Sequence, residues 1–261
     1  MRADEVRRAQ PGGSVVTYLR VYQVSEADLG GALSADAAVE VRLYHTPISL
    51  EEAIAQVQSL TRLAAPRRAV AYSLAHIEQR AAGGWGSLPA VLQKLVAAGL
   101  ADFAEVPVDL LADLPRSLQH TAEAGLRLTR LTVSNPVGSR QLELLATVRT
   151  GLEQLPSVIR FAPLPRVAPA DKPTTGYDDV RMVALSRLAL SDAQIRRPVS
   201  IEVDWSLYGP KLAQVALTFG ADHLDAVPAT SDPALGPRRA TVEDVERNIR
   251  AAGFEPQEYR Y

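Results

Sequence analysis

Helical and strand patterns alternate within residues 176–225, which read GYDDVRMVALSRLALSDAQIRRPVSIEVDWSLYGPKLAQVALTFGADHLD. The pattern predicts a helix over 177–190, a strand over 199–205 and a helix over 209–219, and another strand follows directly. In the second helix, apolar residues recur at the i, i+3, i+4 and i+7 positions of one face, and Gly220 marks the helix end. A strand, a helix and a strand in this order indicate parallel strands joined by a right-handed crossover.

The same alternation extends over most of the chain. Eight strands are expected, at 15–24, 39–45, 69–73, 103–106, 126–134, 158–164, 199–205 and 223–227. Helical patterns separate most of them, at 48–63, 88–98, 114–124, 140–155, 177–190 and 209–219, whereas 25–38 holds at most a brief helix. Eight such units predict an α/β fold, a single (β/α)8 TIM-like barrel, with a distorted or partly open barrel as the alternative. Residues 1–13 are expected to be a disordered lead-in, and 14–261 to form the barrel with a C-terminal helical extension.

The composition is that of an ordinary globular domain. Hydrophobic residues make up 47% of the 261 residues, charged residues 22%, and the formal net charge is −2. No basic field favours a nucleic-acid partner, and no apolar run is long enough to predict a membrane span. The charged N-terminal segment lacks the apolar core of a secretion signal, so we expect a cytoplasmic protein.

Several stretches are similar to one group of enzymes. They are 91–100 (VLQKLVAAGL), 160–165 (RFAPLP), 175–190 (TGYDDVRMVALSRLAL), 200–225 and 241–256 (TVEDVERNIRAAGFEP). They resemble the group of aminofutalosine synthase, dehypoxanthine futalosine cyclase and deazaflavin-cofactor synthase, which are radical S-adenosylmethionine (SAM) enzymes. This resemblance implies an α/β barrel and a link to futalosine-pathway menaquinone biosynthesis.

The residues that carry the chemistry of this group are missing. Its members hold an iron–sulfur cluster with three cysteines in a loop after the first strand, but this sequence has no cysteine, and 23–38 reads QVSEADLGGALSADAA. A cluster requires such ligands, so classical radical SAM catalysis is excluded. The segments that match SAM-contacting parts of the group are also changed, at 45–47, 71–77, 105–110 and 135–138, which argues against SAM. No cofactor is predicted.

Polar side chains at the carboxyl ends of the expected strands form the candidate site, because barrels of this kind place their active sites there. The acid–base candidates are His45, His76 and Asp204. The ligand-binding candidates are Tyr44, Glu105, Asp109, Asn135, Arg160, Arg166, Glu202 and Trp205. His45 and His76 follow neighbouring strands and are candidates to meet at the mouth of the barrel. The four histidines show no HxH or HxxxH spacing, so no metal site is predicted.

Two carboxylates on the seventh expected strand allow two interpretations. Glu202 and Asp204 lie two residues apart and therefore share one side of the strand. Inside the barrel they would lie beside Arg160 or Arg166, where they could form a buried ion network. The alternative is that they contact a ligand.

Two classes of function follow from these observations. The first is a non-catalytic, cluster-less relative of the futalosine-pathway enzymes. It would serve as a partner subunit of a cluster-bearing paralogue, or bind a pathway intermediate. The second is a repurposed enzyme without radicals, which would act on a nucleoside or carboxylate by acid–base chemistry at the barrel mouth. Homo-oligomers and small-molecule ligands are compatible with both.

Overall fold

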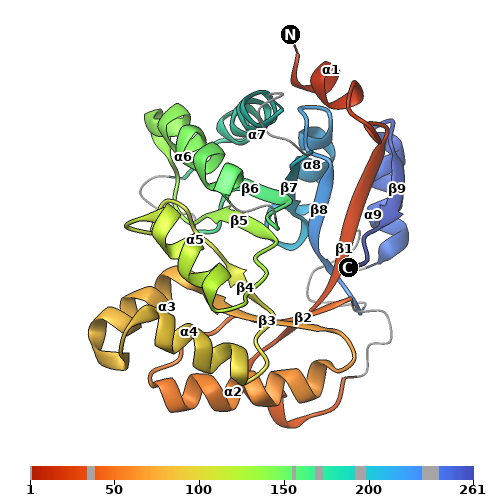
Figure 1. Cartoon of the computed structure of the whole chain (residues 1–261). Helices are drawn as coiled ribbons and strands as arrows, with labels where there is room; N and C mark the ends of the chain where they lie inside the picture. The colour runs from red at the N-terminus through yellow and green to blue at the C-terminus, as the bar shows by residue number, and fades with distance from the viewer. Residues whose placement is uncertain (1, 34–38, 155–156, 168–172, 192–197, 231–240) are drawn as a thin grey trace.

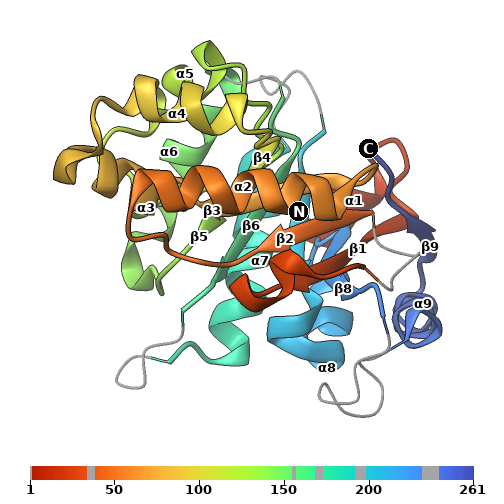
Figure 2. The same ribbon diagram turned by 90° about the horizontal axis from the view of Figure 1, so that it is seen from below.

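The computed structural model describes residues 2–33, 39–154, 157–167, 173–191, 198–230 and 241–261. Eight parallel strands lie at the centre, with helices outside them in both views (Figures 1 and 2). The strands are β1 Val15–Val24, β2 Glu40–Leu43, β3 Arg68–Ser73, β4 Asp102–Glu105, β5 Arg130–Val133, β6 Arg160–Pro165, β7 Ser200–Asp204 and β8 His223–Pro228. This arrangement confirms the predicted (β/α)8 TIM-like barrel.

The barrel is open at one seam. The strand order is β4-β3-β2-β1-β8-β7-β6-β5, so the ladder runs through seven strand pairs and stops between β4 and β5. There, only the segment around Pro107 bridges to Thr132 on β5. The backbone N–H of Val108 donates to Thr132 O at 2.9 Å, and the N–H of Thr132 donates to Val106 O at 2.9 Å. The expected partly open variant of the barrel is therefore the one observed.

Helices follow the strands where the sequence predicts them, and one more, α3 at 74–80, follows β3 where none was predicted. They are α2 Leu50–Ala64, α3 Leu74–Arg80, α4 Leu88–Ala97, α5 Leu114–Glu123, α6 Gln141–Gln154, α7 Gly176–Leu190, α8 Trp205–Leu217 and α9 Val242–Ala251. α2 shows why they form: the Ser49 side chain accepts from the N–H of Glu52 at its N-terminus, and Ala53, Val57 and Leu60 turn one apolar face toward the strands. None of the described helices is long and apolar enough to cross a membrane.

Between β1 and β2 the structure has a 3-10 helix, η1 Glu26–Gly30, which agrees with the brief helix expected there. The last part of that connection, residues 34–38, lies outside the described residues. Two further short helical segments, η2 Ala81–Trp85 and η3 Gly138–Arg140, precede α4 and α6. The helix expected at 209–219 begins earlier, at Trp205, and is interrupted at Gly209, whose φ is 72°.

The N-terminal segment differs from the prediction. The sequence predicts a disordered lead-in over 1–13, but the structure contains a helix, α1 Ala3–Arg8. Arg7 is buried and its guanidinium donates to Leu217 O at 3.0 Å and to Val15 O at 3.1 Å. The same group lies 3.7 Å from the centre of the Phe254 ring. One long-range side chain thus anchors a segment whose composition alone indicates disorder.

The C-terminal extension also differs in part. The expected helix is present as α9, but a ninth strand follows it, β9 Glu255–Glu258, which pairs in parallel with the first half of β1. The second half of β1 pairs with β2, so this long strand has different neighbours at its two ends. The polar sequence EPQE gives no strand pattern. The strand forms through backbone pairing, because two of its four side chains stay exposed.

Alternate strand residues separate an apolar layer from a charged one. On β2, β5, β7 and β8 the residues Val41, Leu131, Val203 and Leu224 belong to the buried apolar core together with the inner faces of the helices. Their sequence neighbours point to the opposite side, into the barrel, because side chains alternate along a strand. Most of those neighbours are charged, and the exceptions are Thr132 and His223, so the interior of this barrel is an ion network.

Candidate functional site

The centre of the barrel interior is Asp225 on β8, which is fully buried. Arg42 on β2 donates to it with both terminal nitrogens, from Nη1 to Oδ2 at 2.7 Å and from Nη2 to Oδ1 at 3.0 Å. Arg130 on β5 donates to Oδ2 as well, and to Glu202 Oε1 at 3.1 Å. Arg42 Nε also donates to Glu40 Oε1 at 2.7 Å. Each of these charged groups is therefore hydrogen-bonded to a group of opposite charge.

Two further arginines extend the network toward the two ends of the barrel. Arg166, directly after β6, pairs with Asp204, and its Nε lies 3.3 Å from Glu105 Oε2. Arg160, at the start of β6, donates to the oxygen of Thr129 at 3.1 Å and to the hydroxyl of Tyr261 at 3.0 Å. Tyr261 thus covers Arg160 at the amino end of the barrel.

The network determines how its acids and bases titrate. Burial alone would raise the pKa of Asp225, but Arg130 and Arg42 hold this pKa well below its ordinary value. Burial and the nearby charge of Asp225 raise the pKa of Glu202. Burial and Arg160 lower the pKa of His223 well below its ordinary value, so this imidazole is neutral at pH 7.

The structure gives most of the predicted ligand-binding residues a partner within the protein. Glu202 lies 3.7 Å from Arg160 Nε and 3.6 Å from Arg166 Nη2, which is the buried network that its position on β7 suggests. Asp204 is the N-cap of α8, where its Oδ1 accepts from the N–H of Leu207 at 2.8 Å. Trp205 is fully buried in the apolar core. It is therefore placed to pack, out of reach of a ligand.

The two candidate histidines lie in separate clusters. His45 Nε2 lies 3.2 Å from Glu52 Oε1, whereas His76 Nδ1 lies 3.2 Å from the Thr46 hydroxyl. Among the described residues no hydrogen bond joins the two imidazoles. The two rings therefore do not pair: His76 reaches only as far as Thr46, the residue next to His45, and His45 turns toward Glu52 on α2.

Tyr44 is the predicted residue that lies between the network and solvent. Its hydroxyl accepts from Arg42 Nη1 at 3.0 Å, and the residue is 40% exposed. It follows β2 and stands at the mouth of the barrel above Arg42. It can therefore contact a molecule that covers the mouth without disturbing the network below.

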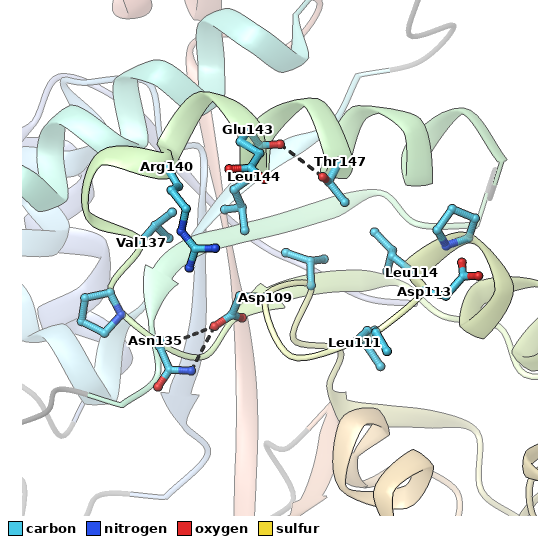
Figure 3. A pocket seen from close by; sticks show the side chains of 14 residues that line it. Asp109, Leu111, Asp113, Leu114, Asn135, Val137, Arg140, Glu143, Leu144 and Thr147 are labelled. Atoms are coloured by element: carbon cyan, nitrogen blue, oxygen red, sulfur yellow. Dashed lines mark hydrogen bonds between the residues drawn. The ribbon is translucent and has the colours of Figure 1, made fainter. Parts of the chain in front are cut away.

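A pocket of about 520 Å³ lies over the open seam, between the starts of α5 and α6 (Figure 3). We call it the seam pocket. Buried Val108, Leu111 and Leu144 form its apolar wall, and two of the predicted binding residues, Asp109 and Asn135, lie on its rim. The volume falls within the range of small-molecule sites.

Asp109 and Asn135 hold the loops after β4 and β5 together. Asp109 Oδ1 accepts from the N–H of Ser134 at 2.7 Å, and Oδ2 accepts from the N–H of Asn135 at 2.9 Å and from its side-chain Nδ2 at 3.2 Å. The Asp109 carboxylate is therefore already occupied. The Asn135 side-chain oxygen, in contrast, accepts no hydrogen bond from the described residues, and Asn135 is exposed.

Arg140 is a functional candidate that sequence reasoning missed. Figure 3 shows its side chain extending from the start of α6 toward the seam pocket, on the side of Asp109 and Asn135. Within the part of the chain that the structure describes, no ion pair to Arg140 is found, in contrast to Arg42, Arg130, Arg160 and Arg166. Only its position at the end of a βα loop could have indicated it.

Comparison with known proteins connects this structure to one group. Residues 161–261 match the family model of the CofH/MqnC C-terminal region. No curated protein matches the chain significantly. For the residues before 161, the structural comparison is the one that gives a match, and it concerns the fold.

Solved structures show the fold of the whole chain. The crystal structure of methylornithine synthase (PylB) matches with a TM-score of 0.62 at 11% identity, covering 98% of this chain and 87% of that one. The FeFe-hydrogenase maturase HydG from Carboxydothermus hydrogenoformans matches with a TM-score of 0.61 at 11% identity, covering 98% of this chain and 70% of that one. At such identity the likeness concerns the fold alone.

The barrel and the C-terminal match agree with the motifs quoted above, and the sequence has no cysteine with which to build a cluster-binding motif. The C-terminal part of the chain, residues 161–261, resembles the CofH/MqnC C-terminal region, and the chain as a whole shares its fold with the two solved structures above.

Proposed function

We propose that this protein is a non-catalytic relative of the futalosine-pathway enzymes that binds an intermediate of menaquinone biosynthesis in the seam pocket. One contrast carries the proposal: the charged groups inside the barrel are paired with one another, whereas Arg140 at the seam pocket is unpaired among the described residues. The charges of the interior are used within the protein, whereas Arg140, at the rim of the pocket, has no ion-pair partner among the described residues.

Arg140 is the cationic residue of a lining that also holds Asp109, Asp113 and Glu143, and its guanidinium suits the carboxylate of a small organic acid with an apolar body. The guanidinium of Arg140 can bind a carboxylate through two parallel hydrogen bonds, and the Thr147 hydroxyl and Asn135 amide lie on the same pocket lining. The apolar wall of Val108, Leu111 and Leu144 would cover the body of the ligand. Chorismate-derived aromatic acids and futalosine-like nucleosides that carry such an acid have this chemistry.

A thermal-shift screen followed by calorimetry tests the proposal. The probes are a chorismate-derived aromatic acid, a futalosine-like nucleoside and SAM. We expect one of the acids to raise the melting temperature, because a ligand at about 100 times its Kd stabilises the folded state by roughly 2.7 kcal/mol. We expect SAM to leave the melting temperature unchanged.

The Arg140→Gln variant should bind that acid at least about tenfold more weakly, since a hydrogen bond to a charged group contributes roughly 1.5–3 kcal/mol. Arg127→Gln is the matched control: it removes an exposed arginine on the connection before β5, at the other end of the barrel. Equal affinity in wild type and Arg140→Gln, or no binding of any acid, contradicts the proposed function.

A second candidate, the partner subunit, is favoured by the exposed apolar side chains. Most of them stand on the loops and first helical turns after the strands, at the mouth of the barrel: Tyr44, Ile48, Leu110, Leu142, Val167, Tyr177 and Leu207. Ile48 is 77% and Tyr177 73% exposed. Apolar residues gathered at one end of a protein are typical of an interaction surface.

Co-purification with the cluster-bearing paralogue tests this candidate. We expect the wild-type chain to associate and the double variant Ile48→Asp/Tyr177→Asp to lose association by about tenfold or more, because both changes place a charge on the surface. The double variant Leu188→Asp/Phe219→Asp alters exposed residues near the ends of α7 and α8 and should still associate. No association, and no effect of the chain on the paralogue's activity, contradicts the partner-subunit role.

A further inference from the structure

Three side chains of the kinds that bind metal ions converge at the mouth of the barrel, away from the seam pocket. Glu26 comes from η1, His45 from the loop after β2, and Glu52 from the first turn of α2. His45 Nε2 lies 3.2 Å from Glu52 Oε1 and 4.0 Å from Glu26 Oε2. One ligand atom of each residue lies within 4.8 Å of the others. Donor atoms bound about 2.0–2.2 Å from one cation have similar mutual distances after a small adjustment.

The two carboxylates are oriented by groups behind them. Glu52 Oε2 accepts from the N–H of Ile48 at 2.8 Å, which leaves Oε1 toward His45. The side-chain Nε2 of Gln56 donates to Glu52 Oε1 at 3.0 Å and to Glu26 Oε1 at 3.2 Å. One amide therefore holds both carboxylates on the same side of the imidazole.

The amide of Gln56 is itself fixed from the interior. Gln56 is 5% exposed, and its Oε1 accepts from the hydroxyl of Tyr72, which is 1% exposed, at 3.0 Å. The same hydroxyl lies 2.9 Å from Ala53 O, so its one hydrogen is shared between the two acceptors, and Tyr72 has a left-handed φ of 62°. Metal sites commonly have such an outer layer of hydrogen bonds that sets the direction of each ligand.

The two carboxylates of the cluster, Glu26 and Glu52, form no ion pair with an arginine or a lysine within the part of the chain that the structure describes. Inside the barrel, in contrast, the neighbouring carboxylates Glu202, Asp204 and Asp225 each form an ion pair with an arginine. The groups that face one another here are two carboxylates, one imidazole and one amide. Their geometry leaves the positive charge to an outside cation.

We propose that Glu26, His45 and Glu52 form a binding site for a divalent transition-metal cation. An imidazole with two carboxylates suits Zn²⁺ or Mn²⁺ better than Mg²⁺ or Ca²⁺, which prefer oxygen ligands alone. All three ligand side chains are partly or largely exposed, so water can complete the coordination. The bound cation would tie η1 and the β2–α2 loop to α2.

Titration of metal-free full-length protein with Mn²⁺ and Zn²⁺ tests the site, with calorimetry for both ions and electron paramagnetic resonance for Mn²⁺. We expect one ion per chain, competition between the two ions, and a loss of affinity of at least tenfold in His45→Gln and in Glu26→Gln. Glu26 is 60% exposed at its side chain, so its variant keeps the fold. Circular dichroism verifies the fold of both.

His76→Gln is the matched control, because this histidine follows the neighbouring strand, lies at the same face and is not part of the cluster. It should bind both ions like wild type. Unchanged affinity in Glu26→Gln and His45→Gln, or an equal loss in His76→Gln, overturns the proposal. The seam-pocket ligand is not needed for this titration, so failure of either proposal leaves the other standing.

Discussion

Replacing the central carboxylate of the barrel, Asp225→Asn, should lower the free energy of unfolding by about 3–5 kcal/mol. Asp225 is fully buried and accepts hydrogen bonds from Arg42 and Arg130. The amide keeps the volume of the side chain but removes its charge, and its NH₂ group cannot accept. The buried guanidinium groups of Arg42 and Arg130 would then lose the negative charge that compensates most of their own charge. Urea unfolding, followed by circular dichroism at pH 7, measures the change.

The matched control is Glu153→Gln, the same chemical change at a surface ion pair. Glu153 pairs with Arg149 across one turn of α6 at 3.5 Å, and both side chains are substantially exposed. Such pairs contribute roughly 0–1 kcal/mol, so the control should unfold close to wild type. A loss for Asp225→Asn no larger than that of Glu153→Gln would show that the interior network does not stabilise the barrel.

Much of the fold could be predicted from the sequence, because each strand and helix carries its own local signal. The stripe on α8, the Ser49 cap of α2 and the glycines that end helices are all readable within one or two turns. The eight expected strands, most of them separated by helices, then indicate a (β/α)8 barrel. The position of its open seam could not be predicted, since it depends on how β4 and β5 meet across the barrel.

The segments that were mispredicted have no local signal. α1 depends on Arg7, whose guanidinium donates to Leu217 O at the end of α8 and to Val15 O at the start of β1. β9 is polar and depends on backbone pairing with β1. In both cases the stabilising contacts join the two ends of the chain to the barrel.

In the candidate site, too, local sequence patterns were predictive, whereas contacts between residues far apart in the sequence were not. Two polar residues two apart on one strand, such as Glu202 and Asp204, correctly indicated a charged side of β7 beside the strand-six arginines. Glu26 and Glu52 could not be associated with His45, because they approach it from η1 and α2 at unrelated spacings. Arg140 could not be separated from ordinary surface arginines, because the absence of an ion pair is visible only in three dimensions.

The buried imidazole of His223 should make the protein less stable as the pH falls. Arg160 Nη1 lies 3.2 Å from Nε2, which must therefore be the acceptor, and the Thr17 hydroxyl lies 2.7 Å from Nδ1, which then carries the hydrogen. The charged groups around the ring are Arg160, Arg130, Arg42, Glu202 and Asp225, and the ring of Tyr259 packs edge-on against it. Burial and Arg160 lower the pKa of His223 well below 6.5 in the folded protein.

The direction of the pH effect follows from that lowered pKa. The unfolded chain takes up a proton on this histidine near pH 6.5, whereas the folded protein does so only at a much lower pH. Stability contributed by His223 is therefore complete above pH 6.5 and falls below it, with a slope approaching ~1.4 kcal/mol per pH unit. Between pH 7 and pH 5 this corresponds to about 2 kcal/mol.

Urea unfolding of wild type and His223→Gln at several pH values isolates this contribution from the other titrating groups. Glutamine can accept from Arg160 and donate to Thr17 but does not titrate, so the stability difference between wild type and variant should shift by about 2 kcal/mol toward the variant from pH 7 to pH 5. His76→Gln leaves the barrel interior intact and should follow the wild-type profile. A pH-independent difference for His223→Gln would mean that His223 takes up its proton at the same pH in the folded and the unfolded protein, and that the carboxylates Glu202 and Asp225 offset burial and Arg160 at this ring.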